Sequence, residues 1–159
     1  MIHQIIISIG DQTLEIRTPD FSKLYPVSTA ANGVGQEEGS FCTPLGVHLV
    51  KSKIGYQLPL NTSFVGRVPE PELFSSELME KHPSRDWILS RILWLSGCEP
   101  GFNRLGNVDS KARYIYIHGT PDSEPMSIPA SHGCIRMRCK DVAELFEHTP
   151  IYTQVIIKE

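Results

Sequence analysis

The chain has no long apolar run, no excess of basic residues and no repeated or low-complexity segment. A membrane-spanning helix needs about 20 consecutive apolar residues, and no stretch approaches that length. Nucleic-acid-binding domains usually carry a basic face, whereas this chain has a net charge of -3 and a pI near 6.1. We therefore expect neither a membrane span nor a nucleic-acid partner.

Export and disulfide signals are also scarce. Residues 1–4 carry no basic segment, and the apolar stretch 5–9 is interrupted by Ser8 and is too short for a signal peptide. The four cysteines show no disulfide-scaffold spacing, which is typical of a reducing compartment. If the chain is full length, we expect it in the cytoplasm; if a leader was removed, the periplasm is the alternative.

Short β-rich segments dominate the pattern, and residues 1–159 fit a single domain. A hairpin around Gly10 and Asp11 joins the first two expected strands. The expected strands are 4–9, 12–17, 24–28, 46–51, 113–118 and 154–158. Helices are expected near 75–81, at 84–97, where apolar residues recur at helical spacing, and at 141–146, where Asp141 is the expected N-cap. Residues 55–83 and 99–113 are expected to be long loops.

Chemically capable residues concentrate around Cys134. A thiol needs a base or a cationic environment to become a thiolate near neutral pH. His118 ends an expected strand and is the first candidate for that base. Three cations follow in the sequence: Arg136, Arg138 and Lys140. Gly133 lets the backbone bend, so that its own N–H and that of Cys134 could face a developing oxyanion.

Several roles remain open at this point. His132 is a second candidate base, but its position two residues from Cys134 is awkward for a shared hydrogen bond, so a site-shaping role is the alternative. Arg136 is a candidate for binding a substrate carboxylate. A metal site would use His118, His132, Cys134 and Cys139, yet their spacing does not match the paired ligands typical of structural zinc. We expect no metal and no cofactor.

These residues resemble the YkuD-type L,D-transpeptidase catalytic domain family. The resemblance rests on His118-Gly119-Thr120 and on the segment from Ser131 to Met137, which reads Ser-His-Gly-Cys-Ile-Arg-Met. It implies a mainly β fold, an L,D-transpeptidase-like β-sandwich with a few peripheral helices. It also implies a nucleophile at Cys134, a base at His118 and a Gly119 carbonyl that orients the imidazole. Ser131, His132, Gly133 and Arg136 match positions that shape the substrate and oxyanion site.

The resemblance further implies a substrate, the tetrapeptide stem of peptidoglycan, so the expected partners are stem peptides or muropeptides. A thioester would form as terminal D-Ala leaves. We expect water to resolve it, as in an L,D-carboxypeptidase of peptidoglycan recycling, because no export signal or wall-binding module is visible and Cys139 could capture Cys134 under oxidising conditions. An amine acceptor, giving 3→3 cross-links, is the alternative.

The family often has Asn at the position of Cys139. Sortase-like and papain-like peptidases also use cysteine and histidine, but this sequence contains no motif that matches theirs. The alternative from another functional class is a non-catalytic binding module.

Overall fold

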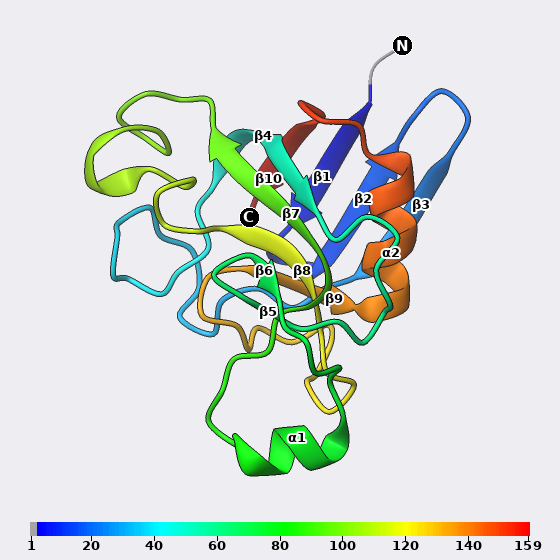
Figure 1. The fold of residues 1–159 in the computed structure, drawn as a ribbon. Helices are drawn as coiled ribbons and strands as arrows, with labels where there is room; N and C mark the ends of the chain where they lie inside the picture. The colour runs from blue at the N-terminus through cyan, green and yellow to red at the C-terminus, as the bar shows by residue number, and fades with distance from the viewer. Residues whose placement is uncertain (1–2) are drawn as a thin grey trace.

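Eight strands form one curled sheet in the computed structural model, which describes residues 3–159 (Figure 1). The strand order is β3-β2-β1-β10-β4-β7-β8-β9, and a separate two-stranded sheet joins β5 and β6. The strands are β1 (Gln4–Ser8), β2 (Thr13–Arg17), β3 (Ser22–Pro26), β4 (Gly46–Ile54), β5 (Phe64–Val65), β6 (Val68–Pro69), β7 (Leu89–Gly97), β8 (Tyr116–Thr120), β9 (Ile135–Arg138) and β10 (Gln154–Lys158). The helices are α1 (Ser76–Lys81), α2 (Cys139–His148) and the short 3-10 helix η1 (Gly106–Val108).

The sheet curls until its two edge strands nearly meet. Ser28, two residues after β3, forms a bridge to Arg136 in β9, with hydrogen bonds of 2.9 Å in both directions between their backbones. Both halves of the sheet therefore face one apolar core, which α2 also enters through Val142, Leu145 and Phe146. The expected mainly β fold with few helices is confirmed.

The amino-terminal hairpin and the last strand follow the sequence pattern closely. β1 and β2 pair antiparallel, with Ile5 opposite Ile16 and Ile7 opposite Leu14, and all four side chains are buried. β10 spans the residues expected for the closing strand and pairs parallel to β1. In these strands core-facing residues alternate with residues on the other side. This two-residue period is why the sequence pattern predicts these elements well.

The helix expected at 84–97 is wrong, because Leu89–Gly97 is strand β7. Both faces of β7 are covered: Leu93 and Leu95 enter the main core, whereas Ile92 packs on the opposite side against a second apolar cluster. A strand buried on both faces shows no clean alternation. A register shift between Leu89 and Ile92 also breaks the two-residue period, so the apolar positions imitate helical spacing.

Other element boundaries differ from expectation at the functional end of the sheet. α2 begins at Cys139, and its N-cap is Arg138 without a side-chain hydrogen bond, so Asp141 lies in the first turn and is not the cap. An acidic residue there is favoured by the helix dipole. The strand expected at 113–118 is β8, which runs on to Thr120, so His118 lies inside the strand.

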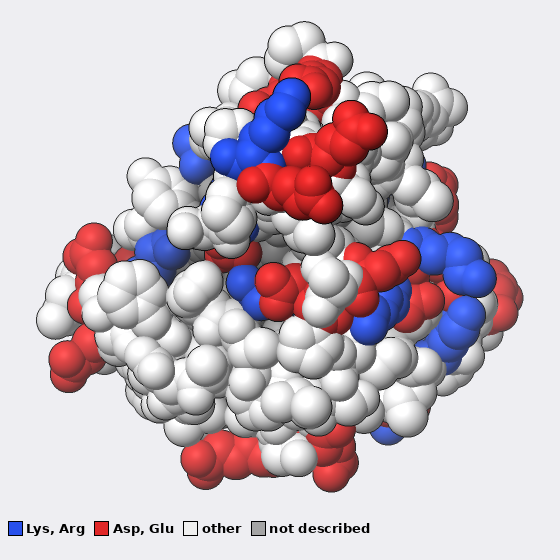
Figure 2. All heavy atoms as spheres, turned by 90° about the horizontal axis from the view of Figure 1, so that it is seen from below, with Lys and Arg blue, Asp and Glu red and all other residues white. Residues whose placement is uncertain are grey.

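The chain between β4 and β7 folds over the side of the sheet that faces away from the main core. We call residues 55–88 the excursion; it contains β5, β6 and α1, and Phe64 packs on Ile92 and Tyr116 of the sheet. The expected helix near 75–81 is confirmed, with Ser75 as its N-cap. Basic and acidic side chains are interspersed on the face seen from below (Figure 2). Within residues 3–159, no helix has the length and apolarity needed to cross a membrane.

Candidate active site

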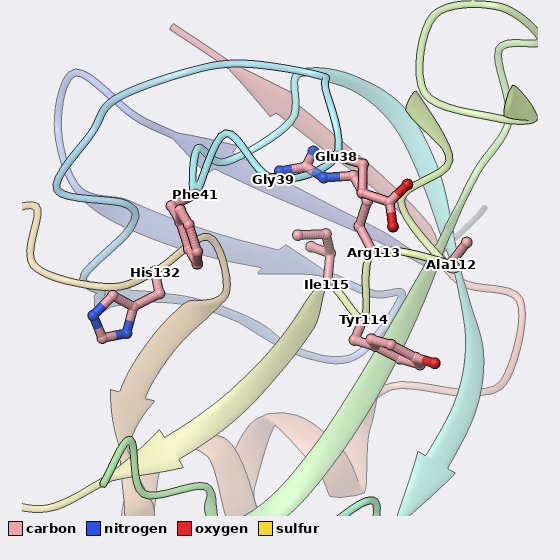
Figure 3. A pocket seen from close by; sticks show the side chains of 8 residues that line it. All are labelled: Glu38, Gly39, Phe41, Ala112, Arg113, Tyr114, Ile115 and His132. Atoms are coloured by element: carbon pink, nitrogen blue, oxygen red, sulfur yellow. The ribbon is translucent and has the colours of Figure 1, made fainter. Parts of the chain in front are cut away.

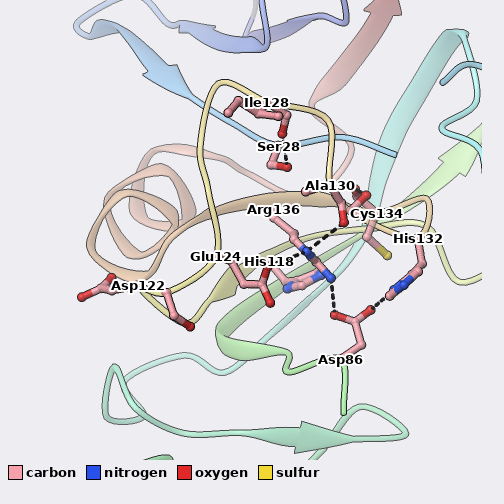
Figure 4. A network of polar contacts seen from close by, with 12 residues as sticks. Ser28, Asp86, His118, Asp122, Glu124, Ile128, Ala130, His132, Cys134 and Arg136 are labelled. Carbon is pink, nitrogen blue, oxygen red and sulfur yellow. Dashed lines mark hydrogen bonds and ion pairs between the residues drawn. The ribbon is translucent and has the colours of Figure 1, made fainter. Parts of the chain in front are cut away.

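Two neighbouring parallel strands bring the candidate nucleophile and base to one face of the sheet. His118 in β8 pairs in register with Arg136 in β9. The adjacent residues Ile117 and Ile135 point into the main core, so His118 and Arg136 point to the opposite face. Cys134 lies two residues before Arg136 and shares that face, where Figure 4 shows these side chains gathered. The structure therefore brings together residues that are 16 positions apart in the sequence.

The Cys134 thiol is half-buried and held by the backbone that leads into β8. Its Sγ lies 3.3 Å from the Tyr116 amide, which donates to it, and 3.3 Å from the Tyr114 carbonyl, to which it donates. Burial raises the pKa of Cys134 to about 12, against the smaller lowering effects of the Tyr116 amide, Arg136 and Arg113. The candidate nucleophile is therefore a neutral thiol at rest, and a neutral thiol needs a base to react.

His118 is arranged to provide that base. Its Nδ1 lies 2.6 Å from the Gly119 carbonyl, which can only accept, so Nδ1 carries the proton and Nε2 carries a free lone pair. Nε2 is buried and has no hydrogen-bond partner among residues 3–159. Burial lowers the pKa of His118, which keeps the imidazole neutral in the resting site. Its catalytic role remains a prediction, but the tautomer is the one a general base needs.

Gly119 occupies a position that no side chain could share. A Cβ built there would lie 2.8 Å from the Leu89 carbonyl oxygen, 3.1 Å from Cys139 Sγ and 3.2 Å from Ser90 Oγ. The register shift in β7 places these atoms directly behind Gly119. The tight packing holds the peptide whose carbonyl orients His118.

Ser131 and Gly133 shape the turn that presents the thiol. Ser131 Oγ donates to the Cys134 carbonyl at 2.6 Å and accepts from the Gly133 amide at 3.2 Å. Gly133 has φ +132°, a conformation that favours glycine, and Thr43 Oγ1 donates to its carbonyl at 2.9 Å. Because Ser131 already uses the Gly133 amide, the Cys134 amide remains as the candidate oxyanion donor of the two expected.

Arg136 is already occupied by protein groups. Its guanidinium donates to Asp86 Oδ1 at 2.8 Å, to Glu124 Oε2 at 3.4 Å and to the Ala130 carbonyl at 3.2 Å, and its side chain is 5% exposed. A substrate carboxylate would have to displace one of these partners, so the structure favours a site-shaping role over the carboxylate-binding role we expected from the sequence.

The cations expected around the thiol are distributed differently. Arg138 donates to the carbonyls of Asp122 and Glu124, away from Cys134, and Lys140 is exposed in the first turn of α2. Of the three expected cations, only Arg136 lowers the pKa of Cys134, and Arg113, from the long loop before β8, does so as well. Arg113 also donates to the Cys42 carbonyl at 2.8 Å, which ties the loop around residues 35–42 to the site.

His132 lies at the surface beside a small cavity. Its side chain is 63% exposed, its Nδ1 lies 3.2 Å from Asp86 Oδ2, and its ring is edge-on to Phe41. The cavity has a volume of about 180 Å³ (Figure 3). Its lining residues are Glu38, Gly39, Phe41, Ala112, Arg113, Tyr114, Ile115 and His132. The stretch 112–115 leads directly to the backbone groups that hold the thiol, so a ligand in this cavity would lie beside Cys134.

The alternative metal site has no support from the geometry. Within residues 3–159, no group of three or more histidine, cysteine or acidic side chains is placed to hold a metal ion. Cys139 in particular contacts the Thr120 carbonyl and lies against Gly119, away from His132.

Sequence analysis missed Asp86 and the role of Thr43. Asp86 fell inside the stretch 84–97 that we expected to be a helix, so nothing in the pattern placed it opposite β9. Thr43 acts through a tertiary contact over 90 positions, for which a single sequence carries no signal.

The chain is similar to known proteins over nearly its whole length. Residues 2–157 match the model of the YkuD family, described as the L,D-transpeptidase catalytic domain. An L,D-transpeptidase from Mycobacterium smegmatis has a TM-score of 0.58 and 14% identity, covering 99% of this chain and 58% of that one. L,D-transpeptidase 3 from Mycobacterium tuberculosis, in complex with a faropenem-derived adduct, has a TM-score of 0.59 and 16% identity, covering 99% and 60%.

The L,D-transpeptidase from Xylanimonas cellulosilytica DSM 15894 has a TM-score of 0.55 and 17% identity, covering 99% and 60%. The chain thus spans about 60% of the length of these structures. No curated protein sequence matches it significantly. The similarity confirms the fold expected from the sequence.

Proposed function

Because the chain belongs to the YkuD family of L,D-transpeptidase catalytic domains, we propose that it is a cysteine acyltransferase that removes terminal D-Ala from tetrapeptide stems of peptidoglycan. The observation that carries this proposal is the buried Nε2 of His118, which has no hydrogen-bond partner within residues 3–159 and lies on the same face of the sheet as the Cys134 thiol. A buried nitrogen without a partner is costly in a folded protein, and its retention is explained by a proton that it must accept.

The chemistry follows from the two protonation states. Nε2 of His118 takes the thiol proton as Cys134 Sγ bonds to the carbonyl carbon between the third residue and D-Ala. The Cys134 amide donates to the oxyanion. When the C–N bond breaks, Nε2 returns the proton to the departing amine, and a thioester remains. Gly119 holds the imidazole throughout, while Ser131, Gly133 and Arg136 hold the turn and His132 lines the substrate cavity.

Water is the acceptor in this proposal, which makes the enzyme an L,D-carboxypeptidase. A water molecule attacks the thioester, Nε2 accepts its proton, and Sγ leaves and is reprotonated. This choice is supported by the exposed surface around His132, through which water can reach the site, whereas an amine acceptor needs a binding site in addition to that of the donor stem. Water needs no cavity of its own.

Incubation of the protein with a purified tetrapeptide stem, with and without an amine acceptor, tests the reaction by mass spectrometry. We expect tripeptide and free D-Ala in both cases. A 3→3 dimer that outweighs tripeptide would support the transpeptidase alternative, as would recovery of the untagged protein from the periplasm. An unchanged stem would contradict both forms of the proposal and favour a binding module.

The nucleophile is tested independently with a β-lactam. L,D-transpeptidase 3 is known in complex with a faropenem-derived adduct, and we expect a carbapenem to add one covalent mass to this protein at Cys134. Cys134→Ser should abolish the adduct. Cys42→Ser, Cys98→Ser and Cys139→Ser are the matched controls and should retain it. Peptide mapping of the adduct to another cysteine would contradict the assignment.

A further inference from the structure

Asp86 brings a carboxylate from the excursion into the middle of the site. Its Oδ1 accepts from Arg136 at 2.8 Å and its Oδ2 accepts from His132 Nδ1 at 3.2 Å, so both oxygens are engaged (Figure 4). His132 lies two residues before Cys134, and Arg136 lies two residues after it. The carboxylate therefore joins the two ends of the segment that carries the nucleophile.

The charged and titratable groups of the candidate site come from several segments of the chain. Asp86 lies on the excursion, Arg136 on β9, His132 and Cys134 on the turn before it, Glu124 after β8 and Arg113 before β8. Burial lowers the pKa of His118, and the charge of Asp86 is the main influence that raises it. The same carboxylate also raises the pKa of Cys134, but there it ranks behind burial and the Tyr116 amide.

We propose that Asp86 is a positioning residue of the active site, which orients His132 and Arg136 and stabilises the His118 imidazolium formed when Cys134 loses its proton. This inference rests on the proposed function, because it assigns Asp86 a part in the same acylation step. The excursion thus contributes Asp86 to a site whose other residues lie on or next to β8 and β9.

The energetic reason lies in the proton transfer itself. When the thiol proton moves to Nε2, a cation forms on a side chain that is 1% exposed, and burial disfavours it. A fixed carboxylate nearby offsets that penalty without any rearrangement during the reaction. Its interaction with the Cys134 thiolate is repulsive, so the net benefit requires that Asp86 act more on the His118 cation than on the thiolate.

Asp86 also determines how His132 faces the cavity. Because Nδ1 of His132 donates to Asp86, the neutral ring presents Nε2 as an acceptor on the side away from Asp86. His132 is 63% exposed, and without this partner its ring would be free to rotate. Asp86 therefore fixes one wall of the cavity that lies beside Cys134.

The structure offers a matched control in Glu124. This carboxylate also pairs with Arg136, at 3.4 Å, and its side chain is 41% exposed, close to the 38% of Asp86. Within residues 3–159, the hydrogen-bond and ion-pair partners of the Glu124 side chain include neither His118 nor His132. Asp86→Asn and Glu124→Gln therefore each remove one negative charge from the same guanidinium, and only the first removes the charge that acts on His118.

The test is the pH dependence of carbapenem acylation at Cys134, followed by intact mass. The acid limb of this profile reports the pKa of His118 and the alkaline limb that of Cys134. In Asp86→Asn both limbs should move to lower pH by roughly half to one unit, because the Asp86 charge raises both pKa values. The acylation rate at neutral pH should fall roughly 3- to 10-fold. Glu124→Gln should leave the limbs in place. Asp86→Glu, which keeps the charge, should retain the wild-type limbs.

A rate loss in Asp86→Asn with unmoved limbs would overturn the proposal and leave Asp86 a purely structural role. NMR titration of the His118 ring in the free protein gives a second measurement that does not depend on catalysis. It should show a lower pKa for His118 in Asp86→Asn and the wild-type value in Glu124→Gln; equal values in all three proteins would also overturn it. If wild type forms no adduct, the proposed function fails, and the NMR titration still decides the influence of Asp86.

Discussion

Two buried histidines lie in two regions of the same sheet, and their surroundings differ in one decisive respect. His48 in β4 uses both ring nitrogens, with Nδ1 3.1 Å from the Gly46 carbonyl and Nε2 2.8 Å from Ser110 Oγ. His118 in β8 uses only Nδ1, and its Nε2 is unpartnered within the described part of the chain. Both side chains are at most 1% exposed.

The contrast separates a histidine with a structural role from the proposed base. His48 and Ser110 form a closed pair that fixes the long loop before β8 to β4, and nothing remains on the ring to react. His118 keeps one nitrogen without a partner within residues 3–159, on the same face of the sheet as the Cys134 thiol and near the charged side chains of Asp86 and Arg136. Burial with an unused nitrogen does not by itself indicate function, since Trp87 Nε1 is also buried without a partner within residues 3–159. The candidate base is distinguished by sharing one face of the sheet with a thiol.

The largest expected effect is the loss of that free nitrogen. His118→Ala should reduce stem hydrolysis by about 10²- to 10⁴-fold, because a positioned general base is lost. His132→Ala should have a smaller effect, since its ring lines the cavity and takes no proton in the proposed reaction. Single-turnover assays, with circular dichroism to confirm folding, measure both. Near-normal turnover in His118→Ala together with an inactive His132→Ala would reverse the two roles.

Removal of His48 should instead act on stability. His48→Ala deletes two buried hydrogen bonds and leaves Ser110 Oγ without its ring partner, at a cost of about 2–4 kcal/mol in the free energy of unfolding. Chemical denaturation followed by fluorescence gives this value. Carbapenem acylation of the folded fraction should stay close to wild type. A variant with normal stability and impaired acylation would break the distinction between the two regions.

The pH dependence of stability sharpens the same distinction. Burial lowers the pKa of His48 in the folded protein to about 4, whereas an unfolded histidine has a pKa of about 6.5. The unfolded chain therefore binds the proton first as the pH falls, and the free energy of unfolding decreases between pH 6.5 and 4, by up to about 3 kcal/mol. His118, whose pKa is also lowered, contributes in the same direction.

Denaturation at several pH values tests the contribution of His48. His48→Gln removes the titrating ring, so its stability should fall less steeply than that of wild type between pH 6.5 and 4. Identical slopes of unfolding free energy against pH in wild type and His48→Gln would contradict this prediction. They would show that folding does not hinder protonation of His48.

The two regions also differ in how well the sequence predicts them. Strands with one core-facing side, such as β1, β2 and β10, follow a two-residue period and were predicted nearly to their boundaries. β7 was predicted as a helix, because it is covered on both faces and interrupted at Ser90 and Arg91. The excursion that covers β7 and brings in Asp86 leaves no periodic trace in the sequence.

The candidate site was predicted where its residues are close in sequence. Ser131, His132, Gly133 and Cys134 form one turn, and His118 with Gly119 lies on the neighbouring strand. The partners of these residues could not be predicted, because they depend on contacts between distant segments. Arg136 shows the consequence: its residue type suits a substrate carboxylate, but the fold supplies Asp86 and Glu124 in that place.

The smallest expected effect concerns Arg136, which pairs in register with His118 across β8 and β9. Arg136→Lys keeps the charge but loses the planar guanidinium that reaches Asp86, Glu124 and the Ala130 carbonyl together. We expect a roughly 3- to 10-fold loss of turnover, as Asp86 becomes less well held. The loss should be the same on free and carboxyl-amidated stems, because the guanidinium binds protein groups and not the substrate. Parallel mass-spectrometric assays of wild type and variant on both stems decide this. A defect that shrinks on amidated stems would show that a substrate carboxylate displaces Asp86 or Glu124, and would restore the role that the sequence first suggested.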